Sequence, residues 1–373
     1  EYFADGLSSE IINMLAQLPE LRVTARRSAF HFKGSDLPVN EIADRLGVSY
    51  ILQGTVFRAG ERLRVDVRLI QAADGFQLWA GSYERRTRET LAVNTDITVN
   101  AASALNIPLD DSQRERMQRA GTRRTDALIA LQKGIELYDR AHHQPNRISL
   151  LRQANVAFER AIEAEPQLAA AYLYHADLMS HILVSQAAGE LDGEITEADI
   201  AQAPDGLAQD YSRAIRYSKN AAQRGVSELN MALIMGQWKG LGPLSLQALT
   251  LSGCEAVAWV HLLNGMSTNP ELFNQAFNRM VRCDPLRPHP TAYLAAAYLW
   301  ESKPSQAENA VLHAWDNKVN HPWLTRILAM ALAAQGRFEE AQAAVSSQMP
   351  SMPEQLLARG IIAALQGNEP IAS

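Results

Sequence analysis

The chain has 373 residues, of which 47% are apolar and 20% charged, and its formal net charge is −6. This length predicts about two or three domains with a core large enough to fold without disulfides. The composition excludes collagen, disordered chains and disulfide scaffolds, the negative charge argues against direct nucleic-acid binding, and no apolar run is long enough to span a bilayer.

Residues 1–108 carry the mixed patterns of a small α+β domain. Asp5 is the predicted N-cap of a helix that ends near Leu18, because apolar residues recur there at helical spacing. Residues 21–25 are predicted to form a short strand. A second helix is predicted over residues 38–46, with Gly47 in the position that commonly ends a helix.

From residue 48 the apolar period becomes two, which predicts strands over residues 48–58, 62–71 and 76–84. Short polar turns separate them, so the sheet is expected to be an antiparallel meander. A helix over residues 86–105 is expected to help cover one face. The middle strand alternates between an apolar and a charged face, namely Leu63, Val65, Val67 and Leu69 against Arg62, Arg64, Asp66 and Arg68.

Strand signals end after a predicted polar linker at residues 109–124, and residues 125–373 are expected to be helical. Ala307 and Val311 recur as Ala341 and Val345, one 34-residue step later. This is the tetratricopeptide period, in which each unit is a helix-turn-helix. The predicted fold is therefore an α+β small sheet domain followed by an all-α tetratricopeptide-like helical solenoid.

The first repeat fits the tetratricopeptide pattern best. Ala154, Phe158 and Ala161 stand where the second helix of a unit needs small residues and an aromatic, and Pro166 closes it. An acidic, Gly-containing insertion at residues 184–206 interrupts the register. Such arrays bury a core only by stacking each unit on its neighbours.

The first residue and the two cysteines bear on processing and compartment. The chain begins with Glu1 and shows no signal peptide, so we expect that it was processed or belongs to a longer protein. Cys254 and Cys283 are interpreted as two buried thiols, with a disulfide as the alternative. Two cysteines do not identify the redox compartment.

No catalytic signature is found. Phosphate-loop, dinucleotide, zincin and nucleophile-elbow patterns are absent. His142 and His143 are adjacent at a helix end, whereas a metal pair would need i, i+4 spacing or further ligands nearby. The acidic residues of the insertion lack the spacing of a calcium loop. We therefore predict no enzyme activity, no cofactor and no metal.

Two surfaces are candidates for binding. Arg62, Arg64 and Arg68 line one strand face and are interpreted as solvated, with an anionic partner as the alternative. The concave side of the repeats is mostly apolar and lacks a carboxylate clamp, so it suits an apolar helix, the preceding domain or a second subunit. Mapping the repeat onto the sequence places these residues in the groove: Leu173, Asp177, His289, Leu299, Trp323, Arg326 and Met330.

Long stretches resemble a known bacterial arrangement. Residues 1–15 (EYFADGLSSEIINML), 21–34 (LRVTARRSAFHFKG) and 42–85 are similar to the TolB-amino-terminal-like (FlgO-like) domain. Residues 126–179 resemble the tetratricopeptide segment that commonly follows it. In that family an apolar strand precedes the position of Glu1, so the resemblance implies that this strand lies before Glu1 or that the sheet lacks it.

The resemblance implies the carboxy-terminal part of a larger regulator. In ToxR- or CadC-type and invasion-type regulators, the amino-terminal part is a winged-helix DNA-binding domain. In other members it is a class III nucleotide cyclase. We therefore expect a non-catalytic sensory and protein-interaction module, with DNA bound only through such an amino-terminal domain. A regulatory module of a cyclase and a periplasmic envelope scaffold are the alternatives.

The expected partners are another protein or a second subunit, with an unidentified small ligand and no membrane contact within this chain. Membrane-anchored members of the family hold this region outside the cytoplasm and soluble members hold it inside. The periplasmic side is preferred and the cytoplasm is left open.

Overall fold

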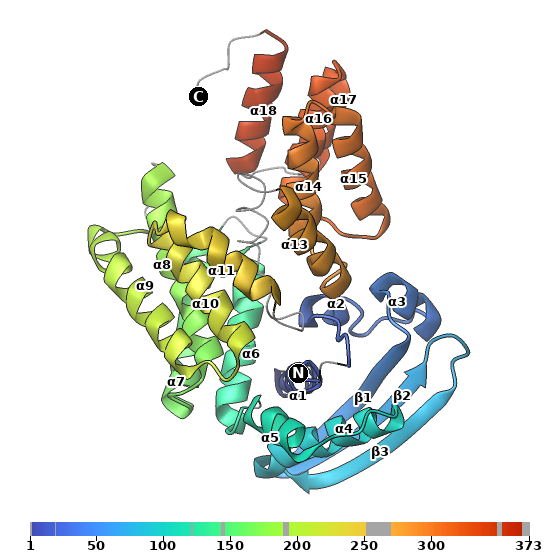
Figure 1. Cartoon of the computed structure of the whole chain (residues 1–373). Helices are drawn as coiled ribbons and strands as arrows, with labels where there is room; N and C mark the ends of the chain where they lie inside the picture. Colours follow the sequence, from blue (N-terminus) through green and yellow to red (C-terminus); the bar gives the residue numbers. More distant parts are fainter. Residues whose placement is uncertain are drawn as a thin grey trace. The chain divides into compact units, whose positions relative to one another are not determined.

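In the computed structural model, the chain is described over residues 2–18, 20–120, 122–142, 146–188, 194–250, 270–348 and 353–367 (Figure 1). It divides into two compact units, Glu1–Ala258 and Trp259–Ser373. The first unit holds the sheet and the helices up to α11, and the second holds α13 to α18.

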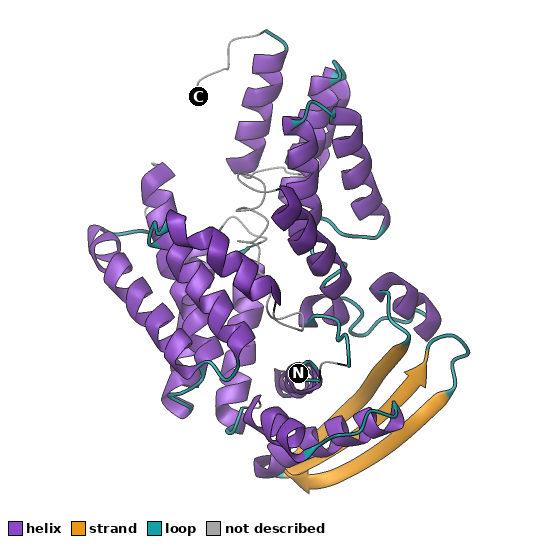
Figure 2. Cartoon of the chain, in the orientation of Figure 1, coloured by secondary structure: helices purple, strands orange, loops and turns teal. Residues whose placement is uncertain are grey.

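The sheet has three antiparallel strands in the order β1-β2-β3, formed by Tyr50–Ala59, Arg62–Gln71 and Gln77–Arg86 (Figure 2). All three predicted strands are confirmed to within two residues. Gly60 and Gly75 lie in the turns with φ of 60° and 75°, a left-handed conformation that glycine adopts without strain. Turn chemistry and the period of two therefore produced the predicted meander.

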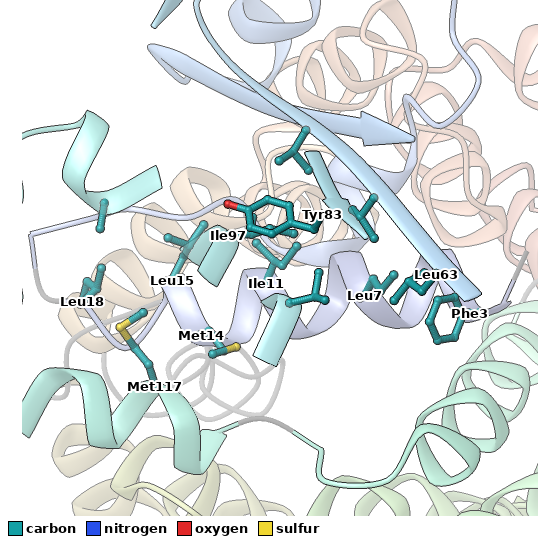
Figure 3. Packing of buried hydrophobic residues seen from close by; sticks show 14 residues of the cluster. Phe3, Leu7, Ile11, Met14, Leu15, Leu18, Leu63, Tyr83, Ile97 and Met117 are labelled. Atoms are coloured by element: carbon teal, nitrogen blue, oxygen red, sulfur yellow. The ribbon is translucent and has the colours of Figure 1, made fainter. Parts of the chain in front are cut away.

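One face of the sheet is buried. Helices α1 (Tyr2–Leu15) and α4 (Thr90–Ala104) lie on it (Figure 1). Figure 3 shows Leu7 and Ile11 of α1 among the apolar residues of the sheet. The alternation of β2 explains this arrangement, because only one of its faces is apolar. The side chains buried from that strand include Leu63, Val65, Val67 and Leu69.

Two local predictions in this domain are wrong. Asp5 lies inside α1 rather than at its N-cap, because Phe3 is already buried and the helix begins at Tyr2. Residues 21–25 form no strand. Leu21 and Val23 pack against the core instead, so their apolar pattern reflects burial without a neighbouring strand.

The short helices follow the sequence more closely. Helix α2 spans Arg26–Phe30 and α3 spans Val39–Leu46, and Gly47 ends α3 in the left-handed conformation with φ of 63°. The helix predicted over residues 86–105 consists of a 3-10 turn at Thr87–Glu89 followed by α4. The end of α3 was predictable because the glycine that caps a helix acts locally, whereas α2 was not predicted.

The segment at residues 109–124 contains helix α5 (Asp111–Ala120). Its Met117 is fully buried, and Figure 3 shows it beside Leu18 in the core of the sheet domain. The polar composition that suggested a linker belongs to the exposed face of this helix. Met117 and the partly buried Leu109 therefore attach the segment to the core.

The described part of the first unit continues with six helices, and each packs against the next. They are α6 (Thr125–Ala141), α7 (Arg147–Ala164), α8 (Ala169–Ala188), α9 (Glu197–Tyr217), α10 (Ala221–Ile234) and α11 (Trp238–Thr250). The insertion predicted at residues 184–206 is helical in part, since α8 extends to Ala188 and α9 begins at Glu197.

The first repeat packs as its pattern predicts. Ala154, Phe158 and Ala161 of α7 are all fully buried. Gly134 of α6 faces the Phe158 ring, and a β-carbon at Gly134 would stand 2.3 Å from Phe158 Cε1. The absence of a side chain at Gly134 therefore lets the two helices approach closely.

The second unit shows the 34-residue period directly. Helices α14 and α16 begin at Pro288 and Pro322, and α15 and α17 begin at Pro304 and Phe338, so both steps are 34 residues. The bounds are α13 (Pro270–Cys283), α14 (Pro288–Trp300), α15 (Pro304–Asp316), α16 (Pro322–Ala334), α17 (Phe338–Gln348) and α18 (Pro353–Leu365).

These helix pairs confirm the predicted fold class, a small α+β sheet domain followed by a tetratricopeptide-like helical solenoid. Val311 and Val345, one step apart, are both fully buried. Cys283 is disulfide-bonded, so the interpretation as a buried thiol is wrong for that residue, whereas Cys254 lies outside the described residues. Among the described helices, none combines the length and apolarity that crossing a bilayer requires.

Candidate interaction surfaces

The sheet domain is joined to the helical repeats by a close helix contact. Helix α1 packs on α6, and a β-carbon at Gly6 would stand 2.6 Å from Leu128 Cγ. Both positions belong to the first unit. The sheet domain and the first repeat are thus held at van der Waals distance through α1.

A buried carboxylate lies at this junction. Glu10 of α1 is 4% exposed and accepts hydrogen bonds from the Thr122 N–H at 2.6 Å and the Thr122 hydroxyl at 2.8 Å. Burial raises the pKa of Glu10, although the two Thr122 hydrogen bonds and the charge of Lys219 act in the opposite direction. Glu10 therefore fixes the chain between α5 and α6 to the core of the sheet domain.

Further polar contacts surround this pair. Ser9 lies 3.4 Å from the buried Gln132 of α6, and Arg26 donates to the Ser9 hydroxyl at 3.1 Å. The Thr125 hydroxyl donates to the Thr87 carbonyl oxygen at 3.1 Å. We define Glu10, Thr122, Ser9 and Gln132 as the junction cluster.

The junction cluster was not predicted from the sequence. A signal was present, because Glu10 interrupts the apolar stripe of α1 between Leu7 and Ile11. An acidic residue on a buried helix face requires a hydrogen-bond partner. The identity of that partner, 112 residues away, is not encoded locally.

The predicted groove residues are divided between the two units. Leu173 and Asp177 are half-buried on α8 in the first unit. The carboxylate of Asp177 faces two histidines: its Oδ2 lies 3.4 Å from His142 Nε2 and 3.4 Å from His181 Nε2. In the part of the chain that the structure describes, these three residues form the one cluster of three potential metal ligands.

In the second unit the structure gathers some of the predicted groove residues. His289 and Trp323, one repeat apart, stand with ring centroids 5.3 Å apart, edge to face. Arg326 and Met330 are half-buried farther along α16. Leu299 is half-buried too, ten positions after His289 on α14, which is about 15 Å along a helix. The groove residues therefore form an aromatic cluster at one end and separate side chains beyond it.

Two tryptophans of the second unit differ in exposure. Trp300, at the end of α14, is 72% exposed. Trp323 is half-buried in contact with His289 and His321. Exposed aromatic side chains at repeat helices are frequent contact points for partner proteins.

The arginine face of β2 is solvated, as interpreted. Arg62, Arg64 and Arg68 are all exposed. Arg64 donates to Asp66 at 3.0 Å, and Asp66 also accepts from the Ser82 hydroxyl. The hydrogen bonds from Ser82 and Arg64 both lower the pKa of Asp66. Arg62 and Arg68 are six residues apart on one strand, about 20 Å, so the three arginines do not converge on a single anion.

A buried ionic contact between His175 and Asp210 joins α8 to α9. His175 Nδ1 lies 2.6 Å from Asp210 Oδ2, and both side chains are largely buried. Burial lowers the pKa of His175, but the hydrogen bond and charge of Asp210 outweigh it, so the pKa of His175 is raised above its usual value. The protonated form of His175 therefore stabilises the packing of these two helices.

We expect Asp210→Asn to destabilise the first unit most at low pH. The His175 pKa is raised in the folded chain, so the contribution of the pair is complete below the unfolded pKa of about 6.5 and is lost as pH rises through the folded pKa. The loss should be about 3 kcal/mol near pH 6 and should shrink toward pH 9. Urea denaturation of both proteins from pH 6 to 9 measures it, and a difference independent of pH would contradict it.

Known proteins similar to this chain are a curated relative and a solved structure. No protein-family model matches the chain. A curated protein described as putative adenylate cyclase 3 of Rhizobium meliloti (strain 1021) is 30% identical over 197 residues, which is 53% of this chain and 33% of that protein. The chain thus spans about a third of the length of that relative.

Among solved structures, a thermophilic TPR protein of Thermus thermophilus is similar to this chain at 14% identity and a TM-score of 0.32. The alignment covers 64% of this chain and 98% of that one. The tetratricopeptide-like architecture described above rests on the helix pairs and their 34-residue step.

Proposed function

We propose that this chain is a non-catalytic sensory and protein-interaction module that regulates an effector domain carried by the same polypeptide, with a DNA-binding domain of a bacterial transcriptional regulator as the effector. The observation that carries the proposal is the junction cluster. It ties the sheet domain to the segment that leads into the first repeat through the buried Glu10–Thr122 hydrogen bonds, and Ser9 lies beside Gln132 of that repeat. Contiguous contacts of this kind are the physical route by which a change in one part biases the other.

The architecture supports a binding role. Stacked helix pairs present extended surfaces on which partner proteins bind, without any catalytic machinery. The aromatic cluster of His289 and Trp323 offers one contact point in the second unit. A ligand acts through such a module by binding one of its arrangements more tightly and shifting the population.

A nucleotide cyclase is the second candidate effector. It is favoured by the relative described as a putative adenylate cyclase, which matches 53% of this chain. In that case the same module would control the synthesis of a second messenger. The periplasmic scaffold has no comparable support.

The coding sequence upstream of Glu1 distinguishes the effectors. Over about 200 codons, the length of one domain, a basic winged-helix pattern supports the transcriptional regulator. A cyclase pattern there instead supports the nucleotide cyclase as the effector. If neither is encoded on the same polypeptide, the proposal is overturned.

We also expect the purified chain to be inactive as a cyclase. Incubated with ATP and Mg²⁺ or Mn²⁺, it should form no cyclic AMP above a protein-free control. The physical reason is that phosphoryl chemistry uses two metal ions, whereas the described residues hold one cluster of three potential metal ligands. Cyclic AMP formation by the chain alone would show that it is itself catalytic.

A further inference from the structure

We propose that His142, Asp177 and His181 form a binding site for a divalent transition metal ion, most suitably Zn²⁺. The three residues come from two helices of the first unit. His142 directly follows α6, whereas Asp177 and His181 lie on α8 at i and i+4 and therefore on one face. The proposal is independent of the regulatory function proposed above.

The spacing of the three ligand atoms fits a tetrahedral ion. His142 Nε2 and His181 Nε2 are 3.2 Å apart, and each lies 3.4 Å from Asp177 Oδ2. A tetrahedral zinc ion with ligands at about 2.0–2.1 Å separates them by about 3.3 Å. Two imidazoles and a carboxylate are also donors that suit this ion, and they leave its fourth position to water or an external ligand.

The ring of His142 is oriented for this role. His142 Nδ1 lies 2.8 Å from the Tyr138 carbonyl oxygen, so it carries the proton and donates it there. The Tyr138 ring packs on the imidazole with centroids 4.4 Å apart. A hydrogen bond of Nδ1 to a backbone carbonyl is the contact that holds metal-binding histidines in place and leaves the lone pair on Nε2.

The carboxylate provides an independent observation. Asp177 Oδ2 is buried and makes no hydrogen bond. Its distance of 3.4 Å to each imidazole exceeds the usual 2.7–3.2 Å of an N–H···O hydrogen bond. A buried carboxylate oxygen that makes no hydrogen bond is costly, and a cation between the three residues would satisfy it.

The electrostatic surroundings act in both directions. Asp177 supplies the negative charge, whereas Arg147 is close enough to oppose a cation. Burial and the neighbouring His142 and Arg147 charges lower the pKa of His181 to about 4, partly offset by Asp177, so His181 is neutral at physiological pH. His142, whose pKa is raised by Asp177 despite its burial, must lose a proton when the metal binds.

The test uses the full chain, freed of metal by chelator, and Zn²⁺ alone as the probe. We expect calorimetry to show one ion per chain with micromolar or tighter affinity, and Tm to rise by about 5 °C at saturating Zn²⁺. His181→Gln and Asp177→Asn should each weaken binding about 100-fold or more. The control His313→Gln, an exposed histidine on α15 in the second unit, should leave it unchanged.

Two further measurements keep the result interpretable if a variant folds poorly. Co²⁺ bound to the unmodified chain should give the visible absorption typical of tetrahedral coordination and be displaced by Zn²⁺. Affinity should fall as pH is lowered from about 8 to 6, because His142 takes up a proton in competition with the metal. Binding weaker than millimolar, or binding that survives both His181→Gln and Asp177→Asn, overturns the proposal.

Discussion

Replacing Glu10 by Ala should destabilise the first unit by about 2–4 kcal/mol, because the Thr122 N–H and hydroxyl lose their acceptor inside the protein. The effect should appear as a lower urea midpoint followed by circular dichroism. Since Glu10 joins α1 to the chain before α6, we also expect faster proteolysis between the sheet domain and α6 in this variant.

Glu10→Gln is the matched control. Its amide oxygen can accept from the Thr122 N–H, and its amide NH₂ can donate to the Thr122 hydroxyl. The raised pKa of Glu10 means that its ionised form is less favourable in the folded chain than in the unfolded chain, and a neutral amide removes this cost. The Gln variant should therefore stay within about 1 kcal/mol of the parent. An equal loss in both variants would show that the charge, rather than the hydrogen bonds, stabilises the junction.

Phe158→Ala should cost about 3–5 kcal/mol, because a fully buried aromatic ring between α6 and α7 is removed. Gly134→Ala should also destabilise, by about 1–3 kcal/mol, since its methyl group would stand 2.3 Å from the ring. Denaturant unfolding of both variants measures these losses. Ala is otherwise the better helix former, so a loss at Gly134 reports the close approach of the helices.

The double variant Gly134→Ala with Phe158→Leu separates packing from other causes. A smaller side chain at position 158 leaves room for the methyl group. The loss of stability in the double variant should therefore be smaller than the sum of the losses measured for Gly134→Ala alone and Phe158→Leu alone. Gly240→Ala in α11 is the control, because a β-carbon there meets nothing within 4 Å. A loss at Gly240 as large as at Gly134, or strictly additive losses, would contradict the packing argument.

The sequence by itself determined the three-stranded sheet and the helical repeat. The alternation of β2 and the turn at Gly60 predicted the meander, because a half-buried strand exposes every second side chain. The 34-residue step was visible because stacked units bury the same positions, as Val311 and Val345 show. The strand predicted at residues 21–25 was wrong because a buried loop and a buried strand both require apolar side chains.

Only the tertiary structure decided which residues meet. Glu10 and Thr122 are 112 residues apart, and Asp177, which the repeat pattern places in a groove, instead lies between His142 and His181. His142 lacked an i, i+4 partner in its own helix, and the packing of α8 supplied two further donors. Periodicity records that a side chain is buried, whereas its partner depends on how helices stack, which no local pattern encodes.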